Sequence, residues 1–224
     1  MIEALTFDVY GTIIDWEESV KEPVLSILNE RKSSAAQFMS IFRSKQLEFA
    51  TNDTLMELPH VSFDEVTRKA FTSTCRTLQV SFNESNLRLF MDGWYHGKPF
   101  PDVTPNLTKL VGKLELIPFS NGDEKMLKEI VKGIPVKFDR VIGADMVGAY
   151  KPARKFYRKG IEILGISLDQ VIHVCRAQFD ACGAKAAGLK VIWVNRGEEA
   201  YDDLPYTPDM IIRDFSELTN ALPH

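Results

Sequence analysis

Hydrophobic and polar positions follow different patterns along the chain, beginning with that of a short strand. Residues 2–7 form an apolar run that closes on Asp8, and Val-Tyr-Gly-Thr follows at once. This pattern predicts a buried strand that runs into a turn. Residues 19–32, 34–49, 63–78 and 84–93 instead place apolar side chains at helical spacing, which predicts successive helices. No comparable strand pattern occurs between residues 16 and 94.

Strands and helices alternate after the segment 97–105, which is rich in proline and glycine. The predicted strands are 114–119, 140–143, 171–174 and 190–194, and the predicted helices are 124–132, 152–164, 179–187 and 215–221. Such alternation favours an α/β fold in which helices cover both faces of a parallel sheet. We therefore expect the helical section after the first strand to be a cap inserted into this sheet.

Composition and charge narrow the classes of function. The 224 residues are 45% hydrophobic and 26% charged, with 27 basic and 31 acidic residues and a formal net charge of -4. This balance is ordinary for a globular protein and makes nucleic acid a poor candidate partner. Apolar runs such as 191–194 are too short for a transmembrane helix, and the first residues lack a secretory signal pattern. We therefore expect no membrane partner and a cytoplasmic location.

The cysteines suggest no structural bridges. Cys75, Cys175 and Cys182 cannot all pair with one another, and none belongs to a CxxC motif. The sequence therefore predicts neither a disulfide framework nor a zinc site.

Polar residues stand where the predicted strands end, and ligands of open parallel sheets bind at that edge. These residues are Asp8, Ser120, Asn121, Lys151 and Asp180. Each has an ordinary explanation when taken alone, because a carboxylate caps turns, a serine caps helices and a lysine is often a solvated surface residue. Their ordered combination favours a catalytic site.

At these positions the sequence resembles the haloacid dehalogenase superfamily. The first motif of that family, DxxGT, matches Asp8 to Thr12, and the later motifs match Ser120, Lys151 and Asp180. The resemblance covers essentially the whole chain. It implies a Rossmann-like core of residues 1–15 and 98–224, with a helical cap of residues 16–97 that closes over the active site.

The family contains mainly magnesium-dependent phosphatases and a smaller group that displaces halide without metal. Phosphatases carry a general-acid aspartate two residues after the nucleophile, where this chain has Tyr10, and a phenol is a poor replacement for a carboxylic acid. Their fourth motif usually supplies a second carboxylate five residues before the position of Asp180, where this chain has Cys175. Because Mg²⁺ prefers oxygen ligands, both changes disfavour a phosphatase.

The cap sequence resembles the L-2-haloacid dehalogenases. In that group an arginine, followed three residues later by Gln-Leu-Glu and an aromatic residue, receives the departing halide, and Arg43 stands in this context. Tyr157 falls where the family places an active-site tyrosine. Without the other motifs, Arg43 reads as a surface residue of a helix and Tyr157 as part of an apolar helix face.

The resemblance implies hydrolytic dehalogenation of a small (S)-2-haloacid to the (R)-2-hydroxyacid without metal or cofactor. Asp8 would attack C2 and form an ester, which water then cleaves. Lys151 would keep Asp8 ionised, and Thr12 would hydrogen-bond it. Asp180 would pair with Lys151 and help position or deprotonate the water, with Tyr157 also in the site.

The same resemblance implies the contacts of substrate and halide. The Ser120 hydroxyl, with the backbone N–H groups of Asn121 and Tyr10, would bind the substrate carboxylate. Arg43 would accept the halide ion. An apolar wall would exclude water, and it would consist of Leu47, Phe63 and Phe179.

The sequence departs from the dehalogenase pattern just before Asp180. The family typically reads Ser-x-Asn before an aromatic residue and the aspartate, whereas here Cys175 and Ala177 replace the serine and asparagine. Gln178 or Arg176 are candidates to compensate for the lost asparagine. Arg176 has two open interpretations: it brings positive charge to the site and favours a more anionic or larger substrate, or it faces solvent.

Three functions remain open from the residues alone: a metal-independent dehalogenase, a phosphatase or other hydrolase of the same fold, and a binding protein that has lost turnover. The identity of the haloacid and its halogen, cleavage of C–F bonds and the physiological substrate are not readable from the sequence. The family is often dimeric, so Phe90, Trp94 and Tyr95 either cover the interface of a homodimer or form the core of the cap.

Overall fold

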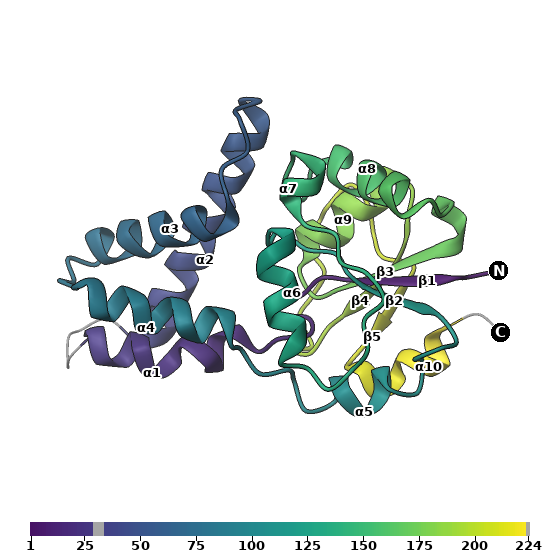
Figure 1. The fold of residues 1–224 in the computed structure, drawn as a ribbon, viewed down its shortest axis with the longest axis horizontal. Helices are drawn as coiled ribbons and strands as arrows, with labels where there is room; N and C mark the ends of the chain where they lie inside the picture. The colour runs from purple at the N-terminus through teal and green to yellow at the C-terminus, as the bar shows by residue number, and fades with distance from the viewer. Residues whose placement is uncertain (29–33, 223–224) are drawn as a thin grey trace.

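Five parallel strands form the centre of one half of the molecule in this computed structural model, which describes residues 1–28 and 34–222. The strands are β1 (Ala4–Phe7), β2 (Glu115–Pro118), β3 (Val171–Cys175), β4 (Lys190–Val194) and β5 (Met210–Ile212). Their order is β2-β1-β3-β4-β5, so β1 lies between β2 and β3 (Figure 1). The predicted α/β fold with a parallel sheet is confirmed.

The sheet differs from the sequence prediction at two places. The prediction of a strand over residues 140–143 is wrong, because Ile142 forms only an isolated parallel bridge, with Phe119. The chain leaves the sheet there because Gly143 already precedes the short helix α7 (Ala144–Val147). Strand β5 was not predicted, since its few residues give no alternating pattern and Met210 and Ile211 are exposed.

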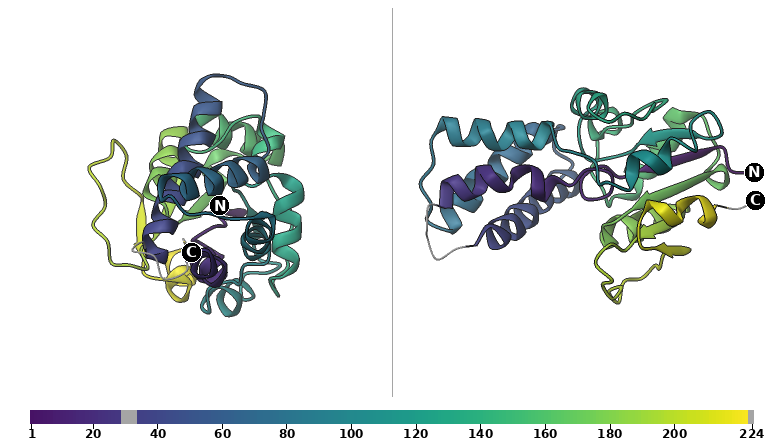
Figure 2. Two further views of the ribbon diagram at one scale, coloured as in Figure 1. Left: turned by 90° about the vertical axis from the view of Figure 1, so that its left-hand side faces the viewer. Right: turned by 90° about the horizontal axis from the view of Figure 1, so that it is seen from below.

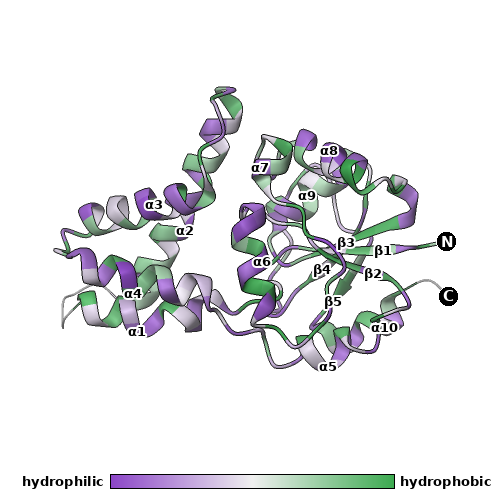
Figure 3. Ribbon diagram, viewed as in Figure 1, coloured by the Kyte–Doolittle hydropathy of each residue, from purple (hydrophilic) through white to green (hydrophobic). Residues whose placement is uncertain are grey.

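Helices cover both faces of this sheet. They are α5 (Val103–Leu107), α6 (Glu124–Lys132), α7, α8 (Arg154–Leu164), α9 (Gln178–Ala187) and α10 (Leu218–Ala221), with short 3-10 turns η1 (Leu168–Gln170) and η2 (Phe215–Glu217). Helices α8 and α9 pack together on one side of the sheet, and α5 and α10 lie on the other (Figure 1). The strands between them are mostly hydrophobic, as Figure 3 shows in green, because a parallel sheet is buried on both faces.

Four helices form a separate body beside the sheet, at the end opposite the N-terminus (Figure 2). They are α1 (Trp16–Leu28), α2 (Ala35–Leu55), α3 (Phe63–Thr77) and α4 (Glu84–Tyr95). The predicted helix over residues 19–32 corresponds to α1, which begins earlier at Trp16, and its last predicted residues lie outside the described part of the chain. Helix α2 continues beyond the predicted end at residue 49.

Aromatic side chains form the core of this helical body. The rings of Phe42 and Phe90 lie 4.9 Å apart, and those of Phe71 and Phe90 lie 4.8 Å apart, centre to centre. Phe90 and Trp94 are fully buried within the single chain, which favours a place in the core of this body over a place at a subunit interface. Tyr95 is only half-buried and donates its hydroxyl to Asp64 within the same body.

Backbone and side-chain hydrogen bonds tie the two bodies together. Where the chain crosses between them, the N–H of Asp15 donates to the carbonyl of Lys98 at 2.9 Å. The Asp123 carboxylate of the sheet-containing body contacts the His60 ring and accepts from the N–H of Phe63, each at 2.8 Å. We propose that residues 16–97 are the cap domain and that residues 1–15 and 98–224 are the core.

Candidate active site

Asp8 lies directly after β1, at the carboxyl edge of the sheet, and is almost fully buried. Its Oδ2 accepts a hydrogen bond from the Thr12 hydroxyl at 3.1 Å, and its Oδ1 accepts one from the Ser120 hydroxyl at 3.2 Å. Gly11 adopts a φ of +88° between them, which allows the chain to turn so that Thr12 reaches back to Asp8. The turn predicted from Val-Tyr-Gly-Thr therefore places a hydroxyl donor on the buried carboxylate.

Lys151 joins Asp8 to a second carboxylate. Its Nζ lies 3.3 Å from Oδ1 of Asp8 and 2.7 Å from Oδ2 of Asp180. Burial alone would lower the pKa of Lys151, but the negative charges of Asp180 and Asp8 raise it above its usual value. The ammonium is therefore charged, and Asn121 fixes the backbone beside it by accepting the N–H of Lys151 at 2.8 Å.

Asp180 lies in the first turn of α9 and is surrounded by donors. The Tyr157 hydroxyl donates to its Oδ1 at 2.7 Å, and the His173 ring contacts the same oxygen through Nε2 at 3.1 Å. Burial would raise the pKa of Asp180, but Lys151 and then His173 outweigh this effect and hold it below its usual range. Asp180 is therefore ionised at neutral pH.

His173 and its partner Thr6 are site residues that sequence reasoning missed. His173 stands inside the apolar run of β3, and the Thr6 hydroxyl on the neighbouring β1 lies 2.9 Å from its Nδ1. No motif marks either residue. One signal could have found His173: it alternates with Cys175 along β3, so both side chains lie on the same face of the sheet, and Cys175 is the strand-end residue.

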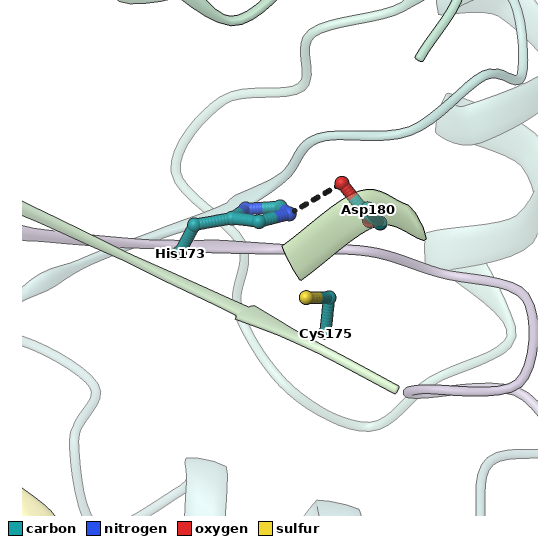
Figure 4. Close-up of side chains that lie close together, drawn as sticks. All are labelled: His173, Cys175 and Asp180. Atoms are coloured by element: carbon teal, nitrogen blue, oxygen red, sulfur yellow. Dashed lines mark hydrogen bonds and ion pairs between the residues drawn. The ribbon is translucent and has the colours of Figure 1, made fainter. Parts of the chain in front are cut away.

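His173, Cys175 and Asp180 bring potential metal ligands within 4.8 Å of one another (Figure 4). The donor set does not suit a divalent cation. The Lys151 ammonium already occupies Asp180 at 2.7 Å, and burial raises the pKa of the Cys175 thiol well above its usual value, so the thiol stays protonated. Within this cluster His173 is better described as a hydrogen-bonded support for Asp180.

A cavity of about 190 Å³ is lined by residues of α1 and α2 and by residues near the carboxyl edge of the sheet. Its lining residues are Tyr10, Gly11, Trp16, Glu17, Arg43, Leu47, Arg176, Ala177, Gln178, Phe179 and Glu199. Four of the sequence-predicted substrate or halide contacts are among them: Tyr10, Arg43, Leu47 and Phe179. Phe63 does not line the cavity but packs behind it, with its ring 6.4 Å from that of Tyr10.

Arg43 reaches the cavity from α2 and is oriented by a side chain that sequence reasoning did not select. Its Nη1 donates to Oε1 of Gln46 at 2.6 Å, and Gln46 in turn donates to the Thr67 hydroxyl at 2.8 Å. Burial lowers the pKa of Arg43, while the negative charge of Asp8 acts in the opposite direction. The guanidinium therefore faces a site where another anion would be stabilised.

Several backbone N–H groups near Asp8 have no acceptor among the described residues. Those of Val9, Tyr10 and Asn121 belong to buried residues at the carboxyl edge of the sheet, and the last two are the groups that the family resemblance assigns to substrate. Buried N–H groups are nearly always satisfied in folded proteins, so such groups are suited to a bound anion. Tyr10 itself stacks its ring on Trp94 with centroids 4.2 Å apart.

The segment that departs from the dehalogenase motif has a clear arrangement. The Gln178 side chain donates to the carbonyl of Ala200 and accepts from the N–H of Asp202, so it does not replace the missing asparagine beside Asp8. The half-buried Arg176 side chain lines the cavity, with its guanidinium 3.6 Å from Glu199 and 3.9 Å from Glu17. Arg176 thus borders the cavity and also meets solvent, and its effect on the choice of substrate stays a prediction.

Comparison with known proteins agrees with this geometry. The family model for haloacid dehalogenase-like hydrolases matches residues 5–194. Haloacetate dehalogenase H-2 of Moraxella sp. (strain B) is 33% identical over 214 residues, which cover 94% of this chain and 93% of that protein. (S)-2-haloacid dehalogenase H-109 of Pseudomonas putida is 30% identical over 224 residues, covering 99% of this chain and 98% of that protein.

A solved structure resembles the whole chain. The L-2-haloacid dehalogenase of Xanthobacter autotrophicus with chloropropionic acid covalently bound has a TM-score of 0.84 and 27% identity, and the match covers 98% of both chains. That protein therefore forms a covalent species with a haloacid. Within the described residues of the present chain, no helix is long and apolar enough to cross a membrane.

Proposed function

Since the chain belongs to the haloacid dehalogenase-like hydrolase family, we propose that it hydrolyses the carbon–halogen bond of a small (S)-2-haloacid to give the (R)-2-hydroxyacid. The observation that carries this proposal is the buried chain of contacts from Asp8 through Lys151 to Asp180. None of these three residues lines the small cavity, but Arg43 does, as do Tyr10 and Phe179, which stand close to Asp8 and Asp180 in the sequence. Together these residues provide a carboxylate nucleophile, a second carboxylate for water and a cation for the halide.

The first step is displacement at C2 by Asp8. A carboxylate oxygen forms a bond to C2 from the side opposite the halogen, and the carbon–halogen bond breaks with its electron pair on the departing halide. This inverts C2 and leaves an ester on Asp8. Lys151 and the Thr12 hydroxyl hold the nucleophile in place, while the Ser120 hydroxyl, which donates to Asp8 in this structure, turns its single proton to the substrate carboxylate.

The second step is hydrolysis of that ester. A water that donates a hydrogen bond to Asp180 attacks the carbonyl carbon of Asp8, and the bond between that carbon and the hydroxyacid oxygen breaks. One water proton passes to the hydroxyacid oxygen, and the other is released when Asp8 ionises again. Because the pKa of Asp180 is held low, its main role here is to orient the water rather than to keep its proton.

Substrate is held at its two ends. The Ser120 hydroxyl and the free N–H groups of Tyr10 and Asn121 bind the carboxylate, and Arg43 receives the halide from the cap side. Apolar side chains of Leu47 and Phe179 line the cavity and keep bulk water away, which strengthens these charge interactions.

Chloride release tests the proposal directly. Purified protein is incubated with (S)-2-chloropropionate in EDTA, beside Asp8→Asn and an aryl phosphate with Mg²⁺. We expect chloride release that ignores EDTA and disappears in Asp8→Asn. Phosphate release that needs Mg²⁺, without chloride, would instead establish the phosphatase alternative, and no product from either substrate would support a protein that has lost turnover.

We also propose that the chain forms a homodimer through the end of α2. Leu55 is 74% exposed, Met56 60% and Leu58 48%, so three large apolar side chains are exposed at the last residue of α2 and just after it. Light scattering of the protein and of a variant with Leu55→Lys and Met56→Lys tests this. A dimer that becomes a monomer in the variant supports the proposal, and a monomer in both contradicts it.

A cytoplasmic location is part of the same proposal. It is supported by Cys75, Cys175 and Cys182, which are all free thiols, as is usual in a reducing compartment. Fractionation of cells that express the full-length chain tests it.

A further inference from the structure

His173 is a fully buried histidine whose two ring nitrogens both have polar partners. Nε2 lies 3.1 Å from Oδ1 of Asp180, and Nδ1 lies 2.9 Å from the Thr6 hydroxyl (Figure 4 shows the first contact). Its ring is held edge-on against Phe119 and Tyr157, with centroids 5.8 and 5.9 Å apart. The ring is therefore fixed in position and orientation.

The charge of Asp180 determines the tautomer of His173. An ionised carboxylate only accepts hydrogen bonds, so Nε2 carries the hydrogen and donates it to Oδ1. In the neutral ring, Nδ1 then accepts from the Thr6 hydroxyl. Thr6 thereby gives Nδ1 a hydrogen-bond partner in the tautomer that donates to Asp180.

The hydrogen bonds of Asp180 leave one acceptor position open. A carboxylate offers about four lone-pair positions, two on each oxygen. On Oδ1 both are used, by Tyr157 and His173, whereas on Oδ2 only Lys151 is bound among the described residues. The open position is therefore on Oδ2, the oxygen that faces Asp8 through Lys151.

Without His173, Asp180 would offer water an acceptor position on both oxygens instead of on Oδ2 alone. A free lone pair on Oδ1 would compete for water, and the terminal torsion of a carboxylate has broad energy minima, so the group could rotate. From this geometry we infer that His173 is a positioning residue that directs the hydrolytic water to Oδ2 of Asp180 and so serves cleavage of the Asp8 ester. This inference rests on the proposed dehalogenase function.

The inference predicts that the two chemical steps respond differently to loss of the imidazole. In single-turnover experiments with (S)-2-chloropropionate, His173→Phe should release chloride within about twofold of the unmodified chain, because Asp8 and Lys151 are unchanged. Release of hydroxyacid should slow by about 10-fold to 100-fold, as expected for loss of a buried hydrogen bond to a charged group. Intact-protein mass spectrometry should then detect the ester accumulating on Asp8.

Two further variants keep the test independent of folding. His173→Gln retains an N–H donor and should recover part of the hydroxyacid rate, and Thr6→Val should lose part of it by leaving Nδ1 of His173 without its hydrogen-bond partner. Val174→Ala is the matched control, because Val174 is equally buried on β3 but faces the other side of the sheet. It should lose stability, measured by urea unfolding, without separating the two steps.

The outcomes distinguish this inference from the function it rests on. No chloride from the unmodified chain contradicts the proposed function itself. If the unmodified chain turns over normally, two results overturn the role of His173. One is equal slowing of chloride and hydroxyacid release in His173→Phe. The other is a Val174→Ala variant in which hydroxyacid release slows but chloride release does not.

Discussion

The ammonium of Lys151 lies closer to Asp180 than to Asp8, at 2.7 Å against 3.3 Å. Both side chains of the shorter pair are 1% exposed. The tight pair with Asp180 keeps the lysine in place, while the longer contact leaves the Asp8 oxygen less strongly bound and better able to act as a nucleophile. The same cation thus serves two carboxylates unequally.

Removal of this cation should disable the site and weaken the fold. In Lys151→Met two buried carboxylates lose their common partner, which we expect to lower the unfolding free energy by about 3 to 5 kcal/mol. Chloride release should fall to background. Urea unfolding and the chloride assay measure these effects. Exposed Lys155→Met on α8 is the control and should change neither, whereas an active Lys151→Met would contradict the role of the ion pair.

The lowered pKa of Asp180 predicts a pH dependence of stability. A carboxyl whose pKa is lower in the folded than in the unfolded protein stabilises the fold above the unfolded pKa, near 4, and this contribution disappears as the pH falls through the folded value. Asp180→Asn should therefore be less stable than the unmodified chain at pH 7, by a margin that shrinks towards pH 3. Urea unfolding at both values tests this, and an equal margin at both would contradict it.

The sequence located the site where its residues carry a recognisable motif at a strand end. Asp8, Ser120 and Asp180 follow β1, β2 and β3, and the parallel sheet brings those ends together. Lys151 was expected after a strand at 140–143, but it follows α7 instead, and its backbone is held by Asn121. Lys151 was identified by its place between the Ser120 and Asp180 motifs along the chain, and not by the predicted strand.

The missed residues depend on tertiary contacts that no local pattern encodes. His173 reads as part of a hydrophobic strand, and only the crossing of β3, β1 and α9 gives it polar partners. Gln46 belongs to the Gln-Leu-Glu segment of the cap motif, but its contacts with Arg43 and Thr67 become visible only when α2 and α3 pack together. Short β5 depends on the neighbouring β4 for its hydrogen bonds.

Arg43 and Gln46 should act as a pair in halide release. Arg43→Ala removes the cation of the cap, so kcat/KM for (S)-2-chloropropionate should fall by about 100-fold or more. Gln46→Leu keeps the charge but removes the hydrogen bond of 2.6 Å that orients it, and a loss of about 10-fold is expected. Steady-state chloride release measures both.

The neighbouring Lys45 supplies the control for that comparison. It lies on the same helix, is partly exposed and pairs with Glu48 at 3.0 Å, away from the cavity. Lys45→Ala should leave kcat/KM within about twofold, since surface ion pairs contribute little. If Lys45→Ala and Arg43→Ala lost activity equally, the effect would reflect general charge rather than a halide site.

Arg176 should affect substrates according to their charge. Its guanidinium has no hydrogen bond shorter than 3.5 Å among the described residues, and its two glutamate contacts are largely solvated, so it is available to an anion that enters the cavity. A 2-halodicarboxylate such as (S)-2-chlorosuccinate offers a second carboxylate that (S)-2-chloropropionate lacks. Arg176→Ser should therefore lower kcat/KM for chlorosuccinate by about 10-fold and change that for chloropropionate by less than about twofold.

Loss of the negative charge of Glu17 or Glu199 should have the opposite effect to loss of Arg176. Because they flank Arg176 with negative charge, Glu199→Gln should raise kcat/KM for chlorosuccinate relative to chloropropionate. Higher salt should reduce both effects by screening. Equal changes for the two substrates in Arg176→Ser would show that this arginine only supports the cavity wall, whereas opposite responses of the two variants would establish that charge at the cavity mouth selects the substrate.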